Sequence, residues 1–243
     1  MTRFKAFAFH FICSLLIAAS LAWLVFFIWY PDMLDKAVGV RNVFGLVLVV
    51  DSILGPFLTL LVYKKGKRYL ELDLAIIVLV QISALAYGLY TVAAGRPQWV
   101  VFNKDRFDVI QTTEVLDKYR PFALPEYQLD SWIGPRWVAA VLPEDDPKVA
   151  QQLLIDALTG GADLPQRLDL YRPLGEARAA LEKRSKDISE LYRHNPKAAV
   201  ENALRKHPQN ARWLPLNARE ESMVVLLDEN QKVIDVLDLR PWD

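Results

Sequence analysis

The sequence predicts a membrane protein with three N-terminal transmembrane α-helices followed by an α+β extracytoplasmic domain. Two observations support this prediction. The 243 residues are 53% hydrophobic although 24% of them are charged, and the apolar excess lies up to about residue 94. Most of the 14 prolines fall after that stretch. We therefore assign residues 1–95 to a three-span transmembrane region and residues 96–243 to an α+β domain with its own core.

Three stretches are long enough to span the hydrocarbon core, which takes about 20 apolar residues. They run from about Phe7 to Tyr30, from Val43 to Tyr63 and from Leu72 to Ala94. Aromatic residues, which prefer the headgroup level, mark their ends. A cleavable signal peptide is the alternative for the first stretch. Its apolar run continues as far as Ile28, well beyond the roughly 7–15-residue core of a signal, which favours an uncleaved anchor.

The charges of the short loops predict the orientation. Residues 64–68 carry four basic side chains, whereas residues 31–42 carry only Lys36 and Arg41. Because positive loops stay on the cytoplasmic side, the N-terminus is expected inside and everything after Gly95 outside. The absence of cysteine after Cys13 is compatible with an oxidising compartment.

The pattern after residue 95 predicts strands at both ends with helices between them, which is typical of an α+β domain. Turn residues, apolar alternation and helix caps define its elements. The expected elements are a hairpin over Trp99–Ile110, a strand over Trp137–Leu142, helices over Asp146–Gly160, Gly175–Arg193 and Asn195–Arg205, and a hairpin over Ser222–Leu239.

Composition and motifs exclude several functional classes. A formal net charge of +0 gives no basic face for nucleic acid. The single cysteine excludes an intrachain disulfide. His10 and Cys13 lie one helical turn apart, but two such ligands are a weak metal signal, and we interpret them as a small polar spot. The sequence contains no nucleophile elbow and no glycine-rich phosphate loop, so we expect no catalytic residues, no cofactor and no metal.

One polar patch stands out within the predicted spans. Asp51 is the one acidic residue deep in a span, and a carboxylate there costs several kcal/mol on insertion scales. Gln81 is expected at a similar depth on the third span. Three interpretations stay open: contacts between helices of this chain, a docking site for another helix, and proton transport. The candidate residues are Asp51, Ser52, Gly55, Pro56, Thr59 and Gln81.

Several segments together resemble one family, the type IV pilin accessory proteins of the TfpX/TfpZ kind. The resemblance extends over essentially the whole chain, and its membrane motifs are fairly specific because Asp-x-x-x-Gly-Pro is unusual within a span. The matching segments are Phe9–Phe11, Trp29–Pro31, Val50–Leu60, Gln81–Tyr90, Arg96–Pro97, Val101–Phe102, Asp105–Phe107, Gly134–Arg136 and Leu237–Trp242.

This resemblance implies a non-enzymatic accessory factor of the bacterial inner membrane for type IV pilus biogenesis. It implies an outer domain in the periplasm, and a pilin subunit as partner, with the pilus assembly machinery and the lipid bilayer as further partners. Before assembly a pilin is one apolar helix in that membrane with its head outside, so a bundle with an outward domain could contact both parts. Two other classes remain as alternatives: a membrane protein that senses a small ligand, and a minor transporter component that uses Asp51.

Overall fold

The computed structural model describes residues 2–143, 149, 151, 153, 155–156, 161–208 and 210–242. The chain forms two compact units. The helical unit consists of Met1–Trp29 and Gly39–Gly95, and the sheet unit consists of Tyr30–Val38 and Arg96–Asp243. Long apolar helices followed by a mixed α and β unit confirm the predicted fold class.

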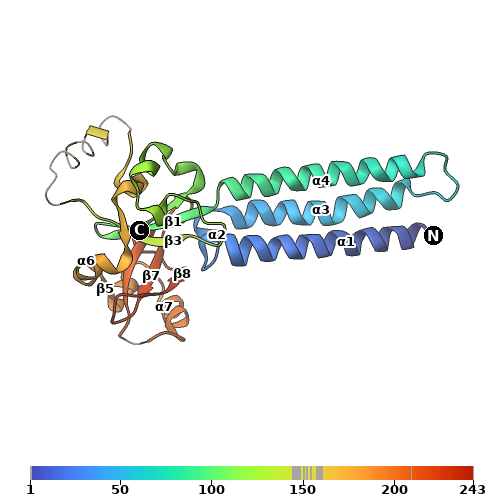
Figure 1. Ribbon diagram of the computed structural model, residues 1–243. Helices are drawn as coiled ribbons and strands as arrows, with labels where there is room; N and C mark the ends of the chain where they lie inside the picture. The colour runs from blue at the N-terminus through green and yellow to red at the C-terminus, as the bar shows by residue number, and fades with distance from the viewer. Residues whose placement is uncertain are drawn as a thin grey trace. The chain divides into compact units, whose positions relative to one another are not determined.

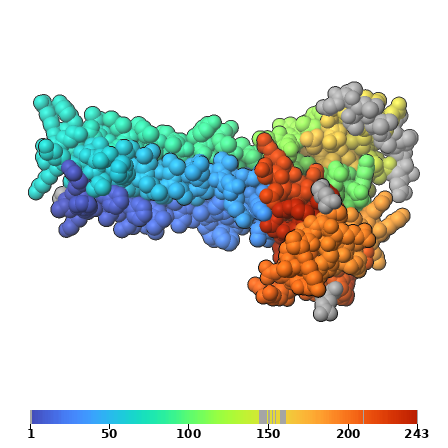
Figure 2. Space-filling view, turned by 180° about the vertical axis from the view of Figure 1, so that it is seen from behind, coloured from blue at the N-terminus to red at the C-terminus, as the bar shows by residue number. Residues whose placement is uncertain are grey.

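Three long helices make up the helical unit. They are α1 (Arg3–Trp23), which continues as the π-helical segment η1 (Leu24–Trp29), α3 (Val40–Val62) and α4 (Leu70–Ala94). All three are long and apolar enough to cross a membrane, as the sequence predicts. Helix α3 lies between the other two and contacts both of them (Figures 1 and 2).

One eight-stranded sheet organises the sheet unit. Its order is β4-β3-β1-β2-β6-β7-β8, with β5 paired to β6 as well. The pairs β1–β3 and β2–β6 are parallel and the others are antiparallel. The strands are β1 (Pro97–Asn103), β2 (Arg106–Gln111), β3 (Arg136–Ala140), β4 (Tyr171–Pro173), β5 (Lys186–Asp187), β6 (Arg212–Asn217), β7 (Met223–Leu227) and β8 (Val233–Leu237).

Short helices and three apolar clusters complete this unit. One cluster joins both halves of the sheet with α2 and α6, the second packs Trp99 with Tyr127 and Tyr171, and the third packs Trp213 with α7. The helices are α2 (Leu34–Ala37), α6 (Arg178–Arg184) and α7 (Lys197–Leu204). The 3-10 turns are η2 (Thr112–Glu114), η3 (Asp117–Phe122), η4 (Pro125–Tyr127), η5 (Leu164–Gln166), η6 (Leu168–Leu170), η7 (Leu174–Ala177) and η8 (Ile188–Arg193).

The segment Tyr30–Val38, which joins the first two spans, is built into the sheet unit. Leu34 and Ala37 are buried in its largest apolar cluster. Lys36 forms ion pairs with Glu221 at 3.2 Å and Asp238 at 2.7 Å. The hydrogen bond to Asp238 raises the pKa of the Lys36 ammonium group. A segment that hydropathy alone describes as a loop is therefore part of a folded core.

The helices and strands of the sheet unit agree in part with those predicted from the sequence. Both hairpins, the strand near residue 137 and the helix after Asn195 are confirmed. The single helix expected over Gly175–Arg193 is wrong, because that segment contains η7, α6, β5 and η8. The cause is strand pairing, since Lys186 and Asp187 pair with Trp213 and Arg212 of β6. Most of the expected helix Asp146–Gly160 lies outside the described residues.

Candidate functional site

The polar patch predicted within the spans includes a contact halfway along two helices of the helical unit. Asp51 is at the middle of α3, and Gln81 is close to the middle of α4. The Gln81 side chain donates a hydrogen bond from Nε2 to the Asp51 backbone oxygen at 3.0 Å. The two residues therefore share a depth, as their sequence positions predict.

Small residues on α3 and α4 allow the two helices to approach closely at this level. A Cβ atom added to Gly55 would lie 2.0 Å from the amide atoms of Gln81, so the absence of a side chain at Gly55 creates the space that Gln81 fills. Gly88 of α4 offers the same kind of contact to Val47, because a Cβ atom added to Gly88 would lie 3.2 Å from Val47 Cγ1. Such small-residue contacts are typical of helix pairs in membranes.

A hydrogen bond between side chains connects α1 to α3. His10 Nδ1 lies 2.7 Å from Thr59 Oγ1, and Thr59 is buried. Ser14 on α1 and Ser52 on α3 are buried too, so further small polar residues of these two helices are covered inside the helical unit. The two interfaces of α3 thus combine close packing with few, specific polar contacts.

Between α1 and α4 the helical unit contains a groove whose floor is α3. We call it the α1–α4 groove. Its volume is about 430 Å³. The groove is lined by Ala6, Phe9, His10, Cys13, Ser14 and Ile17 of α1, by Asp51, Thr59 and Tyr63 of α3 and its C-terminal end, and by Leu74, Val78, Gln81, Ile82 and Leu85 of α4. Most of this lining is apolar, and its polar side chains gather toward the floor.

The structure brings the six candidate residues together but divides them into two groups. Asp51, Thr59 and Gln81 line the groove. Ser52, Gly55 and Pro56 are buried in contacts between helices of this chain. The opposite face of α3 is exposed and apolar, with Val43, Leu46, Ile53, Phe57 and Leu61 among its residues.

Sequence reasoning did not assign His10 to this site. The available signal was helical spacing, because His10, Cys13, Ser14 and Ile17 follow one another at intervals of three, one and three residues on one face of the first span. All four line the groove. Among the described residues, no group of three His, Cys, Asp or Glu side chains could hold a metal ion. The residues that line the groove can form hydrogen bonds and pack closely against an apolar partner.

Comparisons with known proteins identify relatives over almost the entire chain. A family model described as "Fimbrial assembly protein FimB" matches residues 1–33. The fimbrial assembly protein of serogroup I from Dichelobacter nodosus is 31% identical, over 96% of this chain and 94% of the relative. The serogroup E1 protein of the same organism is 28% identical over the same shares of both chains.

A third relative covers a shorter part. The fimbrial assembly protein of serogroups C1 and C2 from Dichelobacter nodosus is 38% identical, over 44% of this chain and 83% of the relative. No solved structure matches the chain. Because the serogroup I protein is similar from end to end, this chain belongs to the fimbrial assembly protein family.

Proposed function

We propose that this protein is a non-catalytic accessory factor of fimbrial biogenesis in the bacterial inner membrane, and that it holds a type IV pilin subunit before the subunit enters the pilus. The names of the relatives, all fimbrial assembly proteins, support the biological process. The single structural observation that supports the mode of action is the α1–α4 groove. A transmembrane helix of the pilin would be its occupant.

The walls of the groove are suited to a helix. Phe9 and Ile17 of α1 face it from one side, and Val78 and Ile82 of α4 from the other, and all four side chains are substantially exposed. In lipid there is little hydrophobic drive for helices to associate, so association depends on close packing and hydrogen bonds. A third helix laid between α1 and α4 would gain packing against two neighbours at once.

The groove also supplies polar contacts within the bilayer. Asp51 of α3, His10 of α1 and Gln81 of α4 line it at depths where a polar group is costly to leave without a partner. Hydrogen bonds between membrane helices are worth only about 0.6–2 kcal/mol each. A pilin helix held this way would be bound specifically but released easily, as a factor that passes its subunit onward requires.

The proposed orientation has the N-terminus in the cytoplasm and the sheet unit in the periplasm. The four basic residues at 64–68 favour a cytoplasmic position for that loop. Lys36, by contrast, forms ion pairs with Glu221 and Asp238 of the sheet unit. The loop that contains Lys36 and the chain after residue 96 therefore share one side of the membrane, which agrees with the two spans between them.

Reporter fusions test this orientation. Alkaline phosphatase, which is active only outside the cytoplasm, is expected to be active when fused after Asp243 and inactive when fused after Gly66. A cytoplasmic reporter at the same two positions serves as the control and should give the reverse pattern. Phosphatase activity at Gly66 without activity at Asp243 would contradict the loop-charge argument.

Photocrosslinking tests the occupant of the groove. A photoreactive amino acid at Ile82, in the groove wall, is expected to capture the pilin helix in native membranes. The matched control is Ile53, which is equally exposed at 59% but lies on the opposite face of α3 near the same depth. Equal capture from both positions, or capture only within this chain from Ile82, would reject the groove as the pilin site. Unchanged piliation after deletion of the gene would reject the assembly role itself.

A further inference from the structure

The segment between β2 and β3 exposes large apolar side chains from a well-fixed backbone. Leu129 is 76% exposed, Trp132 is 63% exposed and Ile133 is 82% exposed. We call these three residues the apolar tip. Phe122, earlier in the same segment, is 76% exposed. Exposed apolar residues are common individually, but several in one short segment indicate an interaction surface.

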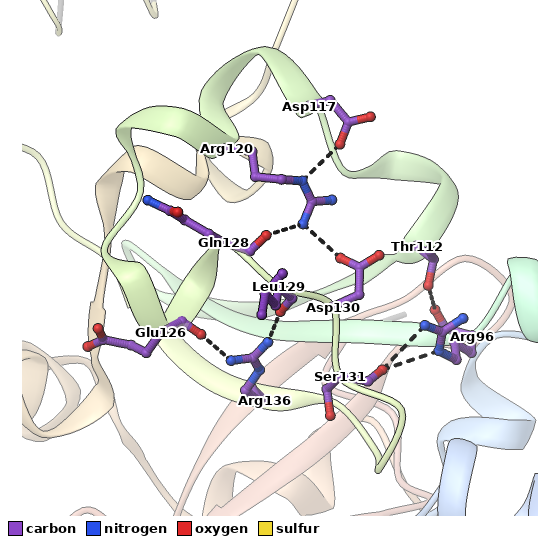
Figure 3. A network of polar contacts seen from close by, with 10 residues as sticks. All are labelled: Arg96, Thr112, Asp117, Arg120, Glu126, Gln128, Leu129, Asp130, Ser131 and Arg136. Atoms are coloured by element: carbon purple, nitrogen blue, oxygen red, sulfur yellow. Dashed lines mark hydrogen bonds and ion pairs between the residues drawn. The ribbon is translucent and has the colours of Figure 1, made fainter.

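Three arginines fix the backbone of this segment (Figure 3). Arg120 donates to the backbone oxygen of Gln128 at 2.7 Å and pairs with Asp117 at 2.9 Å and Asp130 at 3.0 Å. Arg136 donates to the backbone oxygens of Glu126 and Leu129. These contacts neutralise the two acidic side chains and order the chain around the apolar tip.

The inner side of the segment is anchored in the core. Ala123 and Tyr127 belong to an apolar cluster of the sheet unit, and the Tyr127 ring packs edge-on against Trp99 with 5.5 Å between centroids. The segment therefore has a buried base and an outward apolar face. Its exposed side chains cannot be explained as a poorly packed loop.

The third arginine connects the apolar tip to the end of a membrane span. Arg96 follows Gly95, the C-terminal capping residue of α4. Its guanidinium donates to the Ser131 backbone oxygen, with Nη2 at 3.3 Å, and lies 4.2 Å from the centre of the Trp132 ring. The 25 residues of α4 span about 37 Å at 1.5 Å per residue, more than the roughly 30 Å of the hydrocarbon core. Helix α4 is therefore long enough for its C-terminal end to reach the headgroup region.

We infer that the apolar tip inserts into the lipid headgroup region next to the end of α4 and forms a second membrane anchor for the sheet unit. Tryptophan prefers this region, and Trp132 is held there by the buried Arg96 beneath its ring. Leu129 and Ile133 would then be covered by acyl chains. The apolar tip is tied to Arg96, the second residue after the membrane-spanning helix α4, through the contact between Trp132 and the Arg96 side chain. This short connection favours lipid over a distant protein as the partner of the tip.

Environment-sensitive labelling tests this anchor in the full-length protein. Cys13→Ser removes the one native cysteine, and Ile133→Cys accepts an NBD fluorophore. In vesicles of phosphatidylethanolamine and phosphatidylglycerol, the label is expected to show blue-shifted emission and strong quenching by lipids with a nitroxide near the headgroup. The matched control is Glu182→Cys on the exposed face of α6, whose label should remain water-like and unquenched.

Further measurements separate the possible outcomes. Trp132→Ser in the Ile133-labelled protein is expected to reduce quenching, while an unchanged unfolding temperature of the sheet unit shows that the domain is intact. A water-like, unquenched label at residue 133 would overturn the inference. An unquenched label that becomes shielded only when purified pilin is added to the vesicles would overturn it as well, by showing that the tip is a protein contact.

Discussion

Replacing Leu34 with alanine is expected to destabilise the sheet unit by about 2–5 kcal/mol, the usual range for removing a buried leucine side chain. Leu34 is only 1% exposed and packs in the apolar cluster that joins both halves of the sheet. The position is 62 residues before Arg96 in sequence, on the short connection between two membrane spans. Thermal unfolding in detergent, followed by the fluorescence of the buried Trp99 and Trp213, measures the effect.

The neighbouring residue provides a control for Leu34→Ala. Met33 is 44% exposed, and Met33→Ala changes a side chain of similar size on the same backbone segment. We expect this variant to unfold within a few degrees of the unmodified protein, since exposed substitutions usually change stability by less than about 0.5 kcal/mol. Equal stability losses in the two variants would contradict the assignment of Tyr30–Val38 to the folded core.

Replacing Gly55 with leucine is expected to force α3 and α4 apart and to abolish surface fimbriae. A Cβ at this position already meets the Gln81 amide at 2.0 Å. An alanine could be accommodated if the flexible Gln81 side chain moved, with loss of its hydrogen bond to Asp51, worth about 0.6–2 kcal/mol. Leucine adds three further carbons, so the helix backbones must separate and the floor of the α1–α4 groove is lost.

Gly45 is the matched control on the same helix. A Cβ added there meets nothing within 4 Å, so Gly45→Leu should leave the helical unit and piliation close to normal. Gln81→Ala combined with Gly55→Leu should recover part of the lost stability, because it removes the side chain that leucine displaces. The measurements are the apparent unfolding temperature in detergent and the number of surface fimbriae. Normal values for Gly55→Leu would show that α3 and α4 do not pack closely at this site.

The candidate site was predictable as a set of residues but not as a surface. Asp51 and Gln81 were identifiable because polar residues within an apolar span are conspicuous without any alignment. Which of the six residues face a neighbour and which face the groove depends on how α1 and α4 pack on α3. Gly55 and Asp51 are four residues apart on one helix, yet Gly55 is covered by Gln81 whereas Asp51 lines the groove.

By itself, the sequence determined the three spans and the two hairpins, because their signals are local. A span needs only an uninterrupted apolar length, and a hairpin needs two alternating runs around a polar turn. The sheet order was decided by tertiary structure. The parallel pair β2–β6 joins residues about 109 positions apart through only two register pairs, Phe107 with Leu216 and Asp108 with Asn217. No local pattern encodes such a pairing.

Tertiary contacts also overrode local preference in two places. The helical pattern after Gly175 ends at Arg184, because Ser185 and Asp187 are bound by Arg212 and Trp213 of β6, with 2.8 Å from Trp213 Nε1 to the Asp187 backbone oxygen. The segment Tyr30–Val38, short and flanked by spans, became part of a domain that continues only after residue 96. Hydrogen bonds to a distant strand in the first case, and burial in a distant core in the second, outweighed what the neighbouring residues alone favour.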